Sequence, residues 1–325
     1  MPKQDILEQY LFQPIVDTPD PFGQANSYAE FHEQNYEAQL EKVGIDVEAI
    51  YQSKKYRSSD YADQIKMALK NRDQIADILN KHRTSPLNTT WMPVSLYCEK
   101  CNRDKMQLIT WDSDDTLKYT CELCQHNGEE AISTSTRIKL PWRIDWPMRW
   151  SYESVDFEPG GIDHSSEGGS FSTAKEIVKE IYDSKAPIYL QYDLVSIKGA
   201  GGKMSSSSGN VITVNDVLKV YEPEMVRWIF ASYKTNVDFS VSFDLDVIKT
   251  YEDYDRQERL AFGVDSGNQK KVDMAKRVFE LSQVSDMPQE IPFQPSFRHL
   301  CNILQINNGD LENCLLYTSP SPRDS

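Results

Sequence analysis

The 325-residue chain has no run of 18 or more apolar residues, so the sequence predicts no membrane-spanning segment. It opens without a charged stretch followed by an apolar one, which is the pattern of a secretory signal. Its six cysteines are few for this length, and four of them fall in two CxxC pairs, unlike a secreted disulfide framework. These absences predict a cytoplasmic protein with no membrane partner.

Positive charge is also scarce. The chain has 35 Lys and Arg against 50 Asp and Glu, which gives a net charge of −15. Indiscriminate nucleic-acid binding depends on a broad basic surface, so this balance argues against it, although local basic patches remain open. The length allows one large domain or two to three small ones, with enough residues for a substantial core.

The spacing of apolar residues distinguishes helical, strand-like and loop segments in the first half of the chain. Residues 27–82 predict helices, with a cap at Ser59 or Asp60 for the helix that follows. Residues 91–137 contain three strand-like segments, SLYC, LITW and LKYTC, around the cysteine pairs. Residues 141–170 are rich in tryptophan, proline and glycine and predict a loop region. The expected buried positions of the helices are Ile65, Leu69, Ile75, Ile78 and Leu79.

The next segments alternate between helix and strand. TAKEIVKEIYDS predicts a helix, with Thr173 and Glu176 placed as a capping box. Two apolar runs then predict strands, one between Tyr192 and Ile197 and the other between Val211 and Val214. Beyond Asn215 the pattern is helical again. Such alternation predicts an α/β sheet.

Between the two apolar runs stands GGKMSSSSGN, residues 201–210. Composition alone fits a flexible linker. However, glycines let the backbone approach a ligand closely, and exposed N–H groups, hydroxyls and the Lys203 ammonium together suit a phosphate. The position between two strand-like runs favours the phosphate-binding interpretation.

The two cysteine pairs are CEKC, residues 98–101, and CELC, residues 121–124. Each CxxC turn presents two thiolates, and two such turns complete a tetrahedral zinc site. A four-thiolate site leaves no position for a substrate, so we expect structural zinc, which is compatible with a ribbon that touches nucleic acid. The predicted ligands are Cys98, Cys101, Cys121 and Cys124.

The segment PWRIDWPMRW, residues 141–150, places three tryptophans at helical spacing around Asp145. Pro147 argues against one continuous helix, because the residue before a proline is driven toward extended backbone. An aromatic wall with a carboxylate suits a cationic ligand, whereas simple core packing is the alternative. The following FEPGGIDHSSEGG brackets Asp163 and His164 with two glycine pairs ahead of a helix, where anions and carboxylates bind readily.

Five stretches of the chain together resemble the class I lysyl-tRNA synthetases of archaea and some bacteria. They span roughly residues 11–260 in the family's order, and the tryptophan and GGIDH segments are the most specific of them. They are TPDPFG with SYAEFHE, WMPVSLYCEKC, PWRIDWPMRW, FEPGGIDHSSEGGSFSTA and KGAGGKMSSSSGN.

The resemblance implies an α/β fold: a partial Rossmann-type class I catalytic domain, a zinc-ribbon-like insertion and the start of an all-helical domain. Residues 1–90 would be a mainly helical part of the catalytic domain, and residues 91–137 the zinc-binding insertion. Residues 138–215 would complete the second catalytic half with the serine-rich loop. Residues 216–313 would form a helical stem and the start of the anticodon-binding domain. Residues 314–325 follow neither the helical nor the strand periodicity, and we predict that they are a non-native tail.

The resemblance also implies a reaction, the ATP-dependent attachment of lysine to tRNA(Lys) through a lysyl-adenylate, with Mg²⁺ accompanying ATP and Zn²⁺ as structural metal. The implied catalytic residues are Lys203, Ser205, Ser206 and Ser207, and ATP contacts would add Gly202, Met204 and Gly209. Trp142 and His164 would line the lysine pocket, with Asp145 and Asp163 as neighbours that shape it.

Two departures from the family pattern stand out. No plausible His-x-Gly-[His/Asn] turn exists, because HNGE at residues 126–129 directly follows a cysteine pair rather than an apolar strand. Ser208 stands where the family usually has a lysine. Residue 1 also corresponds to a point inside the family's chain. The resemblance therefore predicts a fragment without the amino-terminal signature region and most of the anticodon-binding domain, and inactive by itself.

Three alternatives remain beside this interpretation. Another class I synthetase shares the serine-rich loop but not the tryptophan and GGIDH segments. A zinc-ribbon RNA-binding protein would need basic residues near the cysteines, where this chain has several aspartates and glutamates. An inactive paralogue that binds lysine or ATP is the third, and the oligomeric state is open.

Overall fold

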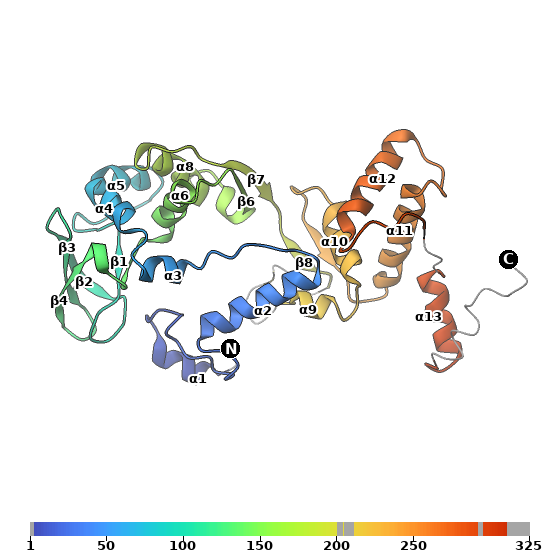
Figure 1. Ribbon diagram of the computed structural model, residues 1–325, viewed down its shortest axis with the longest axis horizontal. Coiled ribbons are helices and arrows are strands. Elements are labelled where there is room, and N and C mark those ends of the chain that lie inside the picture. Colours follow the sequence, from blue (N-terminus) through green and yellow to red (C-terminus); the bar gives the residue numbers. More distant parts are fainter. Residues whose placement is uncertain (1–2, 200–203, 205–210, 292–294, 311–325) are drawn as a thin grey trace, which may run out of the picture. The chain divides into compact units, whose positions relative to one another are not determined.

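A computed structural model describes residues 3–199, 204, 211–291 and 295–310 (Figure 1). The chain divides into two compact units. The first unit comprises Met1–Tyr36 and Val47–Leu194, and the second comprises Glu37–Asp46 and Val195–Ser325. Helix α2 (Tyr28–Lys42) contributes residues to both.

The first unit is mixed α/β. Its helices are α1 (Gln4–Leu7), α3 (Gln52–Arg57), α4 (Ala62–Lys70), α5 (Arg72–Asn80), α6 (Trp142–Tyr152), α7 (Ile162–Ser165) and α8 (Ser170–Glu180), with short 3-10 turns at Glu8–Tyr10 and Ile132–Thr134. Its strands are β1 (Ser95–Leu96), β2 (Met106–Trp111), β3 (Thr116–Cys121), β4 (Asn127–Ala131), β5 (Ile138–Lys139), β6 (Phe157–Gly161) and β7 (Ile188–Tyr192).

Helices α4 and α5 each bury one apolar face. The five apolar residues predicted to be buried in them are all buried, as the spacing of three and four residues requires. They share a core with Ile144 and Met148 of α6 and Ile177 of α8, and also with Leu117 and Tyr119 of β3. The core of the first unit is therefore continuous between its helices and the cysteine-bearing strands.

Strands β2, β3 and β4 form an antiparallel sheet in that order. Tyr119 of β3 faces Gly128 of β4, and a Cβ at Gly128 would lie 2.4 Å from the Tyr119 ring, so only glycine fits there. The Tyr119 hydroxyl accepts a hydrogen bond from the Glu99 N–H at 3.0 Å. The three predicted strand segments are confirmed, whereas β4, which is rich in glutamate, was missed.

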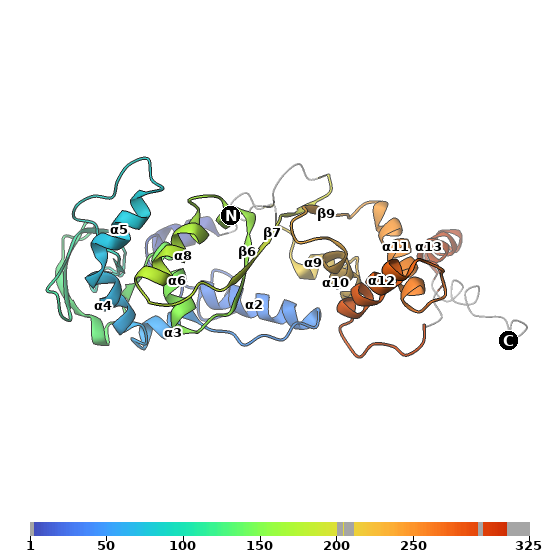
Figure 2. The ribbon, with the colours of Figure 1, turned by 90° about the horizontal axis from the view of Figure 1, so that it is seen from above.

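Strands β6 and β7 pair in parallel, with Phe157 opposite Ile188 and Gly161 opposite Tyr192. Helices α7 and α8 connect them, which makes a β-α-β unit (Figure 2). Trp146, Trp150, Ala174 and Val178 form a separate small core, and Tyr189 of β7 packs against it. The predicted α/β arrangement is confirmed at this level.

The second unit also contains a parallel pair of strands, β8 (Val195–Ile197) and β9 (Phe239–Val241), joined through α9 (Val214–Val217) and α10 (Pro223–Ser232). The remaining helices are α11 (Asp246–Ala261), α12 (Gln269–Ser282) and α13 (Phe297–Ile306). Thr213 and Asp216 form a capping box at α9, while the side chains of Asn268 and Ser296 cap α12 and α13. The helical prediction beyond Asn215 is correct except for β9.

The prediction that Pro147 interrupts the tryptophan segment is wrong. Helix α6 runs through Pro147, and the residues on both sides of it, Trp146 and Met148, are buried. A proline inside a helix costs about 3 kcal/mol, whereas burying one large apolar side chain contributes about 1.5–3 kcal/mol. Several such side chains outweigh the proline here. The predicted loop region 141–170 is accordingly α6, β6 and α7 instead.

Three local predictions are also wrong. Helix α8 begins at Ser170, so Thr173 lies inside it, is fully buried and donates to the backbone of Ser170 rather than capping. Helix α4 begins after Tyr61 without a side-chain cap, so neither Ser59 nor Asp60 caps it. The second apolar run was predicted to be a strand, but Val214 in it starts helix α9, because Thr213 and Asp216 form a capping box there.

Candidate functional site

Helix α6 presents three tryptophans in a row at helical spacing. The Trp142 ring stacks on the Trp146 ring, with centroids 5.1 Å apart and planes 16° from parallel. Trp146 and Trp150 are buried, whereas Trp142 is 46% exposed. The buried pair belongs to the core, and Trp142 is the member that is exposed to solvent.

His164 reaches this aromatic group from α7, which follows the carboxyl end of β6. Its ring centroid lies 6.0 Å from that of Trp142 and 5.9 Å from that of Trp146. The structure thus brings together the two residues predicted to line a lysine pocket, although they are 22 positions apart in the sequence. Asp163 is their neighbour in α7.

Asp145 lies on the buried side of α6. Its Oδ2 atom is 2.9 Å from the Arg149 Nε, one helical turn away, and the Tyr56 hydroxyl donates a hydrogen bond to Oδ1. Burial raises the pKa of the Asp145 carboxyl, and the Arg149 cation opposes that shift. The Arg149 guanidinium carbon in turn lies 5.6 Å from the Trp142 ring centroid. Asp145 is therefore paired with an arginine, and its predicted role as a countercharge for lysine stays a prediction.

Replacing Tyr56 with phenylalanine is expected to lower the free energy of unfolding by about 2 kcal/mol. The Tyr56 hydroxyl also accepts a hydrogen bond from the Leu140 N–H at 3.2 Å, so its loss leaves two groups without this partner. Urea denaturation measures the change. Tyr36→Phe is the control, because that ring is exposed. Equal stability of the two variants would contradict the expectation.

A second group of aromatic residues supports the His164 turn. A Cβ at Gly160 of β6 would lie 2.0 Å from the Tyr189 hydroxyl oxygen, so Tyr189 covers that glycine. Tyr189 stacks on Phe171 with centroids 3.6 Å apart, and its hydroxyl lies 2.8 Å from the Ser165 Oγ. Sequence reasoning missed these residues. The glycine pair at the end of a strand was the available signal, because it indicates close approach of another group.

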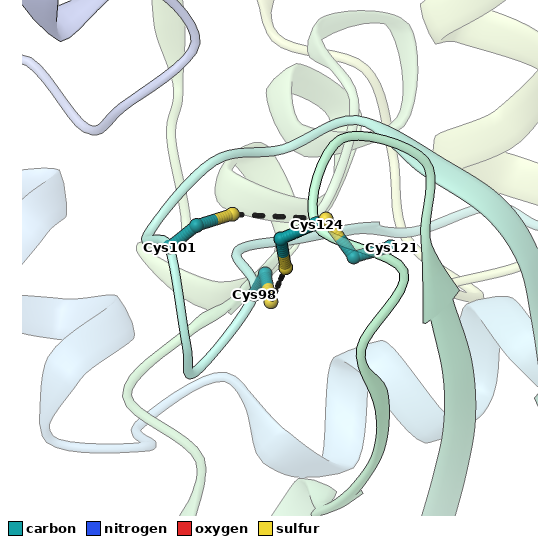
Figure 3. Close-up of side chains that lie close together, drawn as sticks. All are labelled: Cys98, Cys101, Cys121 and Cys124. Carbon is teal, nitrogen blue, oxygen red and sulfur yellow. Dashed lines mark hydrogen bonds between the residues drawn. The ribbon is translucent and has the colours of Figure 1, made fainter.

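The four cysteines predicted as metal ligands lie together (Figure 3). The Sγ atoms of Cys98 and Cys124 are 3.6 Å apart, those of Cys101 and Cys121 are 3.7 Å apart, and all four lie within 4.8 Å of one another. Four thiolates at about 2.3 Å from one ion would be spaced by about 3.8 Å in a tetrahedron. The cluster therefore fits a tetrahedral metal ion.

The surroundings of Cys101 and Cys121 shift the pKa values of their thiols in opposite directions. Burial raises the pKa of Cys101 to about 12. Burial acts in the same direction at Cys121, but the N–H groups of Cys124 and Leu123 outweigh it and lower that pKa to about 7. A divalent ion supplies the positive charge that four clustered thiolates need.

A side-chain hydrogen bond links the two cysteine turns. The Nε2 atom of His126, just after the second turn, lies 2.6 Å from the Glu99 carboxylate in the first turn. This contact holds the two turns against each other beside the four thiols.

Most of the predicted serine-rich loop falls outside the described residues. This applies to Gly202, Lys203, Ser205, Ser206, Ser207 and Gly209, as well as to Ser208. Met204 is described, and it lines an apolar cavity of about 150 Å³ in the second unit together with Ile197 and Ile212. The roles predicted for the loop stay predictions. Within the described ranges, no helix is long and apolar enough to cross a membrane.

The first unit thus contains a parallel β-α-β unit, an aromatic group beyond the carboxyl end of β6, and a cluster of four thiols. The family model described as "tRNA synthetases class I (K)" matches residues 1–285. The chain belongs to this family of class I tRNA synthetases. The resemblance seen in the sequence is confirmed.

Curated relatives that match nearly the whole chain are lysine–tRNA ligases. The protein of Borrelia garinii subsp. bavariensis is 50% identical over 98% of this chain and 60% of its own length. The protein of Treponema pallidum is 48% identical over 100% of this chain and 62% of its own length. The protein of Pyrococcus horikoshii is 40% identical over 98% of this chain and 61% of its own length. The chain thus spans about 60% of the length of these relatives.

Proposed function

We propose that this protein attaches lysine to tRNA(Lys) in the cytoplasm, using ATP and Mg²⁺ to form a lysyl-adenylate first. The observation that carries the proposal is the exposed Trp142 ring beside His164. This group lies just beyond the carboxyl end of the parallel strand β6, where α/β proteins generally bind their ligands. The names of the relatives, lysine–tRNA ligase, support the choice of lysine.

The aromatic wall suits the side chain of lysine. Its methylene groups would lie along the Trp142 ring, and its ammonium would be attracted to the ring face. Asp163, next to His164, would add negative charge that favours a cation. Asp145, which pairs with Arg149, would shape the same pocket from helix α6. A shorter amine would leave part of the wall uncovered, which gives discrimination by length together with charge.

The serine-rich loop would act on the other substrate. Lys203, with Ser205, Ser206 and Ser207, would stabilise the negative charge that grows on the leaving pyrophosphate. Gly202 and Gly209 would let the backbone approach the ATP phosphates, with Met204 in contact beside them.

Two structural proposals accompany the reaction. The four thiolates would hold one Zn²⁺ in a closed, structural site. The β6–β7 pair would belong to a larger Rossmann-type sheet. Supporting this, Ile188, Leu190 and Tyr192, which share one face of β7, are 74%, 40% and 48% exposed. Apolar residues in such a row are normally covered by another layer.

Binding of L-lysine tests the proposed site. Isothermal titration calorimetry should show that Trp142→Ala weakens lysine binding by about 2 kcal/mol, or roughly thirtyfold, because the cation loses its ring face. Trp111→Ala, on strand β2, is the control and should bind normally. Norleucine, which lacks the side-chain ammonium group of lysine, should bind none of these proteins. Unchanged lysine affinity in Trp142→Ala would overturn the placement of the site.

A further inference from the structure

The first unit has a pocket, separate from the Trp142–His164 group, that is lined by cationic and hydroxyl side chains. It has a volume of about 360 Å³, and its lining residues are Leu79, His82, Arg83, Thr84, Ser85 and Arg143. They come from the end of α5, the segment that follows it, and helix α6 (Figure 1). None of these six residues is acidic, so the pocket wall carries only positive or neutral groups.

The charge of this pocket is unusual for so acidic a chain. Residues 81–97 contain no Asp or Glu, although the chain has 50 of them. Lys81 is paired with Glu176 at 2.5 Å, and His82 Nε2 lies 3.9 Å from the same carboxylate. By contrast, Arg83 and Arg143 form no ion pair with any residue that the structure describes, and both are exposed. Two guanidinium groups are thus available to an anion.

Hydrogen bonds to the protein hold the two arginines at the pocket. The Arg83 Nε donates to the Ser85 carbonyl at 3.1 Å. The Arg143 Nη1 donates to the Thr173 hydroxyl at 3.4 Å. Each guanidinium keeps further N–H groups for a ligand, because arginine carries five of them.

This pocket adjoins the Trp142–His164 site. Arg143 follows Trp142 on helix α6. The turn after His164 contacts the pocket, because the Arg143 Nη1 donates to the Gly168 carbonyl at 3.5 Å. A Cβ at Gly168 would lie 2.8 Å from the His82 Nδ1, and a Cβ at Gly169 would lie 2.9 Å from the His164 carbonyl oxygen. The pocket and the Trp142–His164 site thus share helix α6 and the turn that follows His164.

We propose that this pocket binds the phosphate backbone at the 3′ acceptor end of the tRNA. The inference rests on the proposed function, which requires the terminal nucleotide to reach an activated lysine at Trp142 and His164. Guanidinium groups bind phosphates in pairs of hydrogen bonds, and serine and threonine hydroxyls add further contacts to the backbone. A pocket with two available arginines and two hydroxyl residues has this chemistry.

Binding of RNA to the 325-residue chain tests the proposal. The probe is a fluorescein-labelled RNA minihelix with a single-stranded CCA end, and fluorescence anisotropy gives Kd between roughly 50 and 200 mM potassium chloride. The double variant Arg83→Ala/Arg143→Ala should bind at least about tenfold more weakly at low salt. Its slope of log K against log salt should be shallower by about 0.7 for each phosphate that the variant no longer neutralises.

Two control variants show whether a loss of RNA affinity comes from the pocket itself, from the change in net charge or from misfolding. Lys118→Ala/Lys179→Ala also removes two exposed cations of the first unit, each already paired with a neighbouring glutamate, and should bind like the wild type. Arg83→Lys/Arg143→Lys keeps the charge and should keep most of the salt dependence.

The outcomes also distinguish this inference from the proposed function. We expect the double alanine variant to lose RNA affinity while it binds lysine with the wild-type Kd. Wild-type RNA affinity in that variant, or no RNA binding by the wild type, overturns the pocket assignment. Loss of ATP affinity without loss of RNA affinity also overturns it, because the pocket would then hold a free nucleotide. Failure of lysine binding at Trp142 would count against the proposed function instead.

Discussion

Replacing Cys121 with serine is expected to abolish zinc binding and to unfold residues 91–137. In the proposed zinc site each of the four thiolates would supply one corner of a tetrahedron, so the loss of one would leave the site incomplete. Binding of structural zinc is worth on the order of 10 kcal/mol in small zinc modules, which is comparable to the whole stability of a domain. Elemental analysis should fall from one zinc per chain to none, and hydrogen exchange should show loss of protection in strands β2 to β4.

The effect should spread beyond the cysteine-bearing sheet. Leu117 and Tyr119 of that sheet lie in the same core as Ile65 and Ile75, so α4 and α5 should exchange faster as well. The β6–β7 pair packs on the separate core around Trp150 and should keep its protection. Cys301→Ser, in α13 of the second unit, is the matched control and should retain zinc. A zinc-free Cys121→Ser protein with wild-type protection would refute a structural role for the metal.

Gly160→Ala is expected to destabilise the β-α-β unit by about 3 kcal/mol, the upper part of the range for overpacking. The new methyl group would lie 2.0 Å from the Tyr189 hydroxyl oxygen and 2.4 Å from two ring carbons. Tyr189 has no simple way to move aside, because it stacks on Phe171 and its hydroxyl contacts Ser165. Thermal unfolding should show a clear fall in Tm, and His164, which follows on α7, should lose its place beside Trp142.

The neighbouring glycine provides the control for this prediction. A Cβ at Gly161 would lie 3.5 Å from the Tyr192 ring, which is an ordinary contact, so Gly161→Ala should change stability little. Introducing Tyr189→Ala together with Gly160→Ala should cost less than the sum of the two single changes, because the clash is then gone. Additive losses would show that the steric argument is wrong.

The parts of the fold and site that were predictable depend on neighbours in sequence. Each CxxC turn sets the spacing of its own two thiols, so the cluster follows from the motif once the two turns meet. The apolar spacing of Ile65, Leu69 and Ile75 likewise marks one face of each helix. The ion pair of Asp145 with Arg149 spans one helical turn. It was missed because Pro147 made a helix unlikely there.

The remaining features depend on contacts between distant segments. The Tyr56 hydroxyl meets Asp145 across 89 residues, and Tyr189 covers Gly160 from the next strand. The start of α8 at Ser170 was missed because the Thr173 and Glu176 spacing matched a capping box, yet the fully buried Thr173 belongs inside the helix. Local sequence rules contain no information on such packing, which overrides them.

The long separation between some of these partners bears on the order of folding during synthesis. The Tyr182 hydroxyl donates to the carbonyl of Gln64 in helix α4, 118 residues earlier. At about 5–20 residues per second, a ribosome takes roughly 6–24 s to cover that distance, whereas the cysteine turns are complete within a few seconds of each other. A nascent chain that has emerged from the ribosome as far as residue 140 would thus present all four cysteines while α4 and α5 still lack their partners from α6 and α8. In that interval the apolar faces of these helices would be available to chaperones that bind exposed hydrophobic segments.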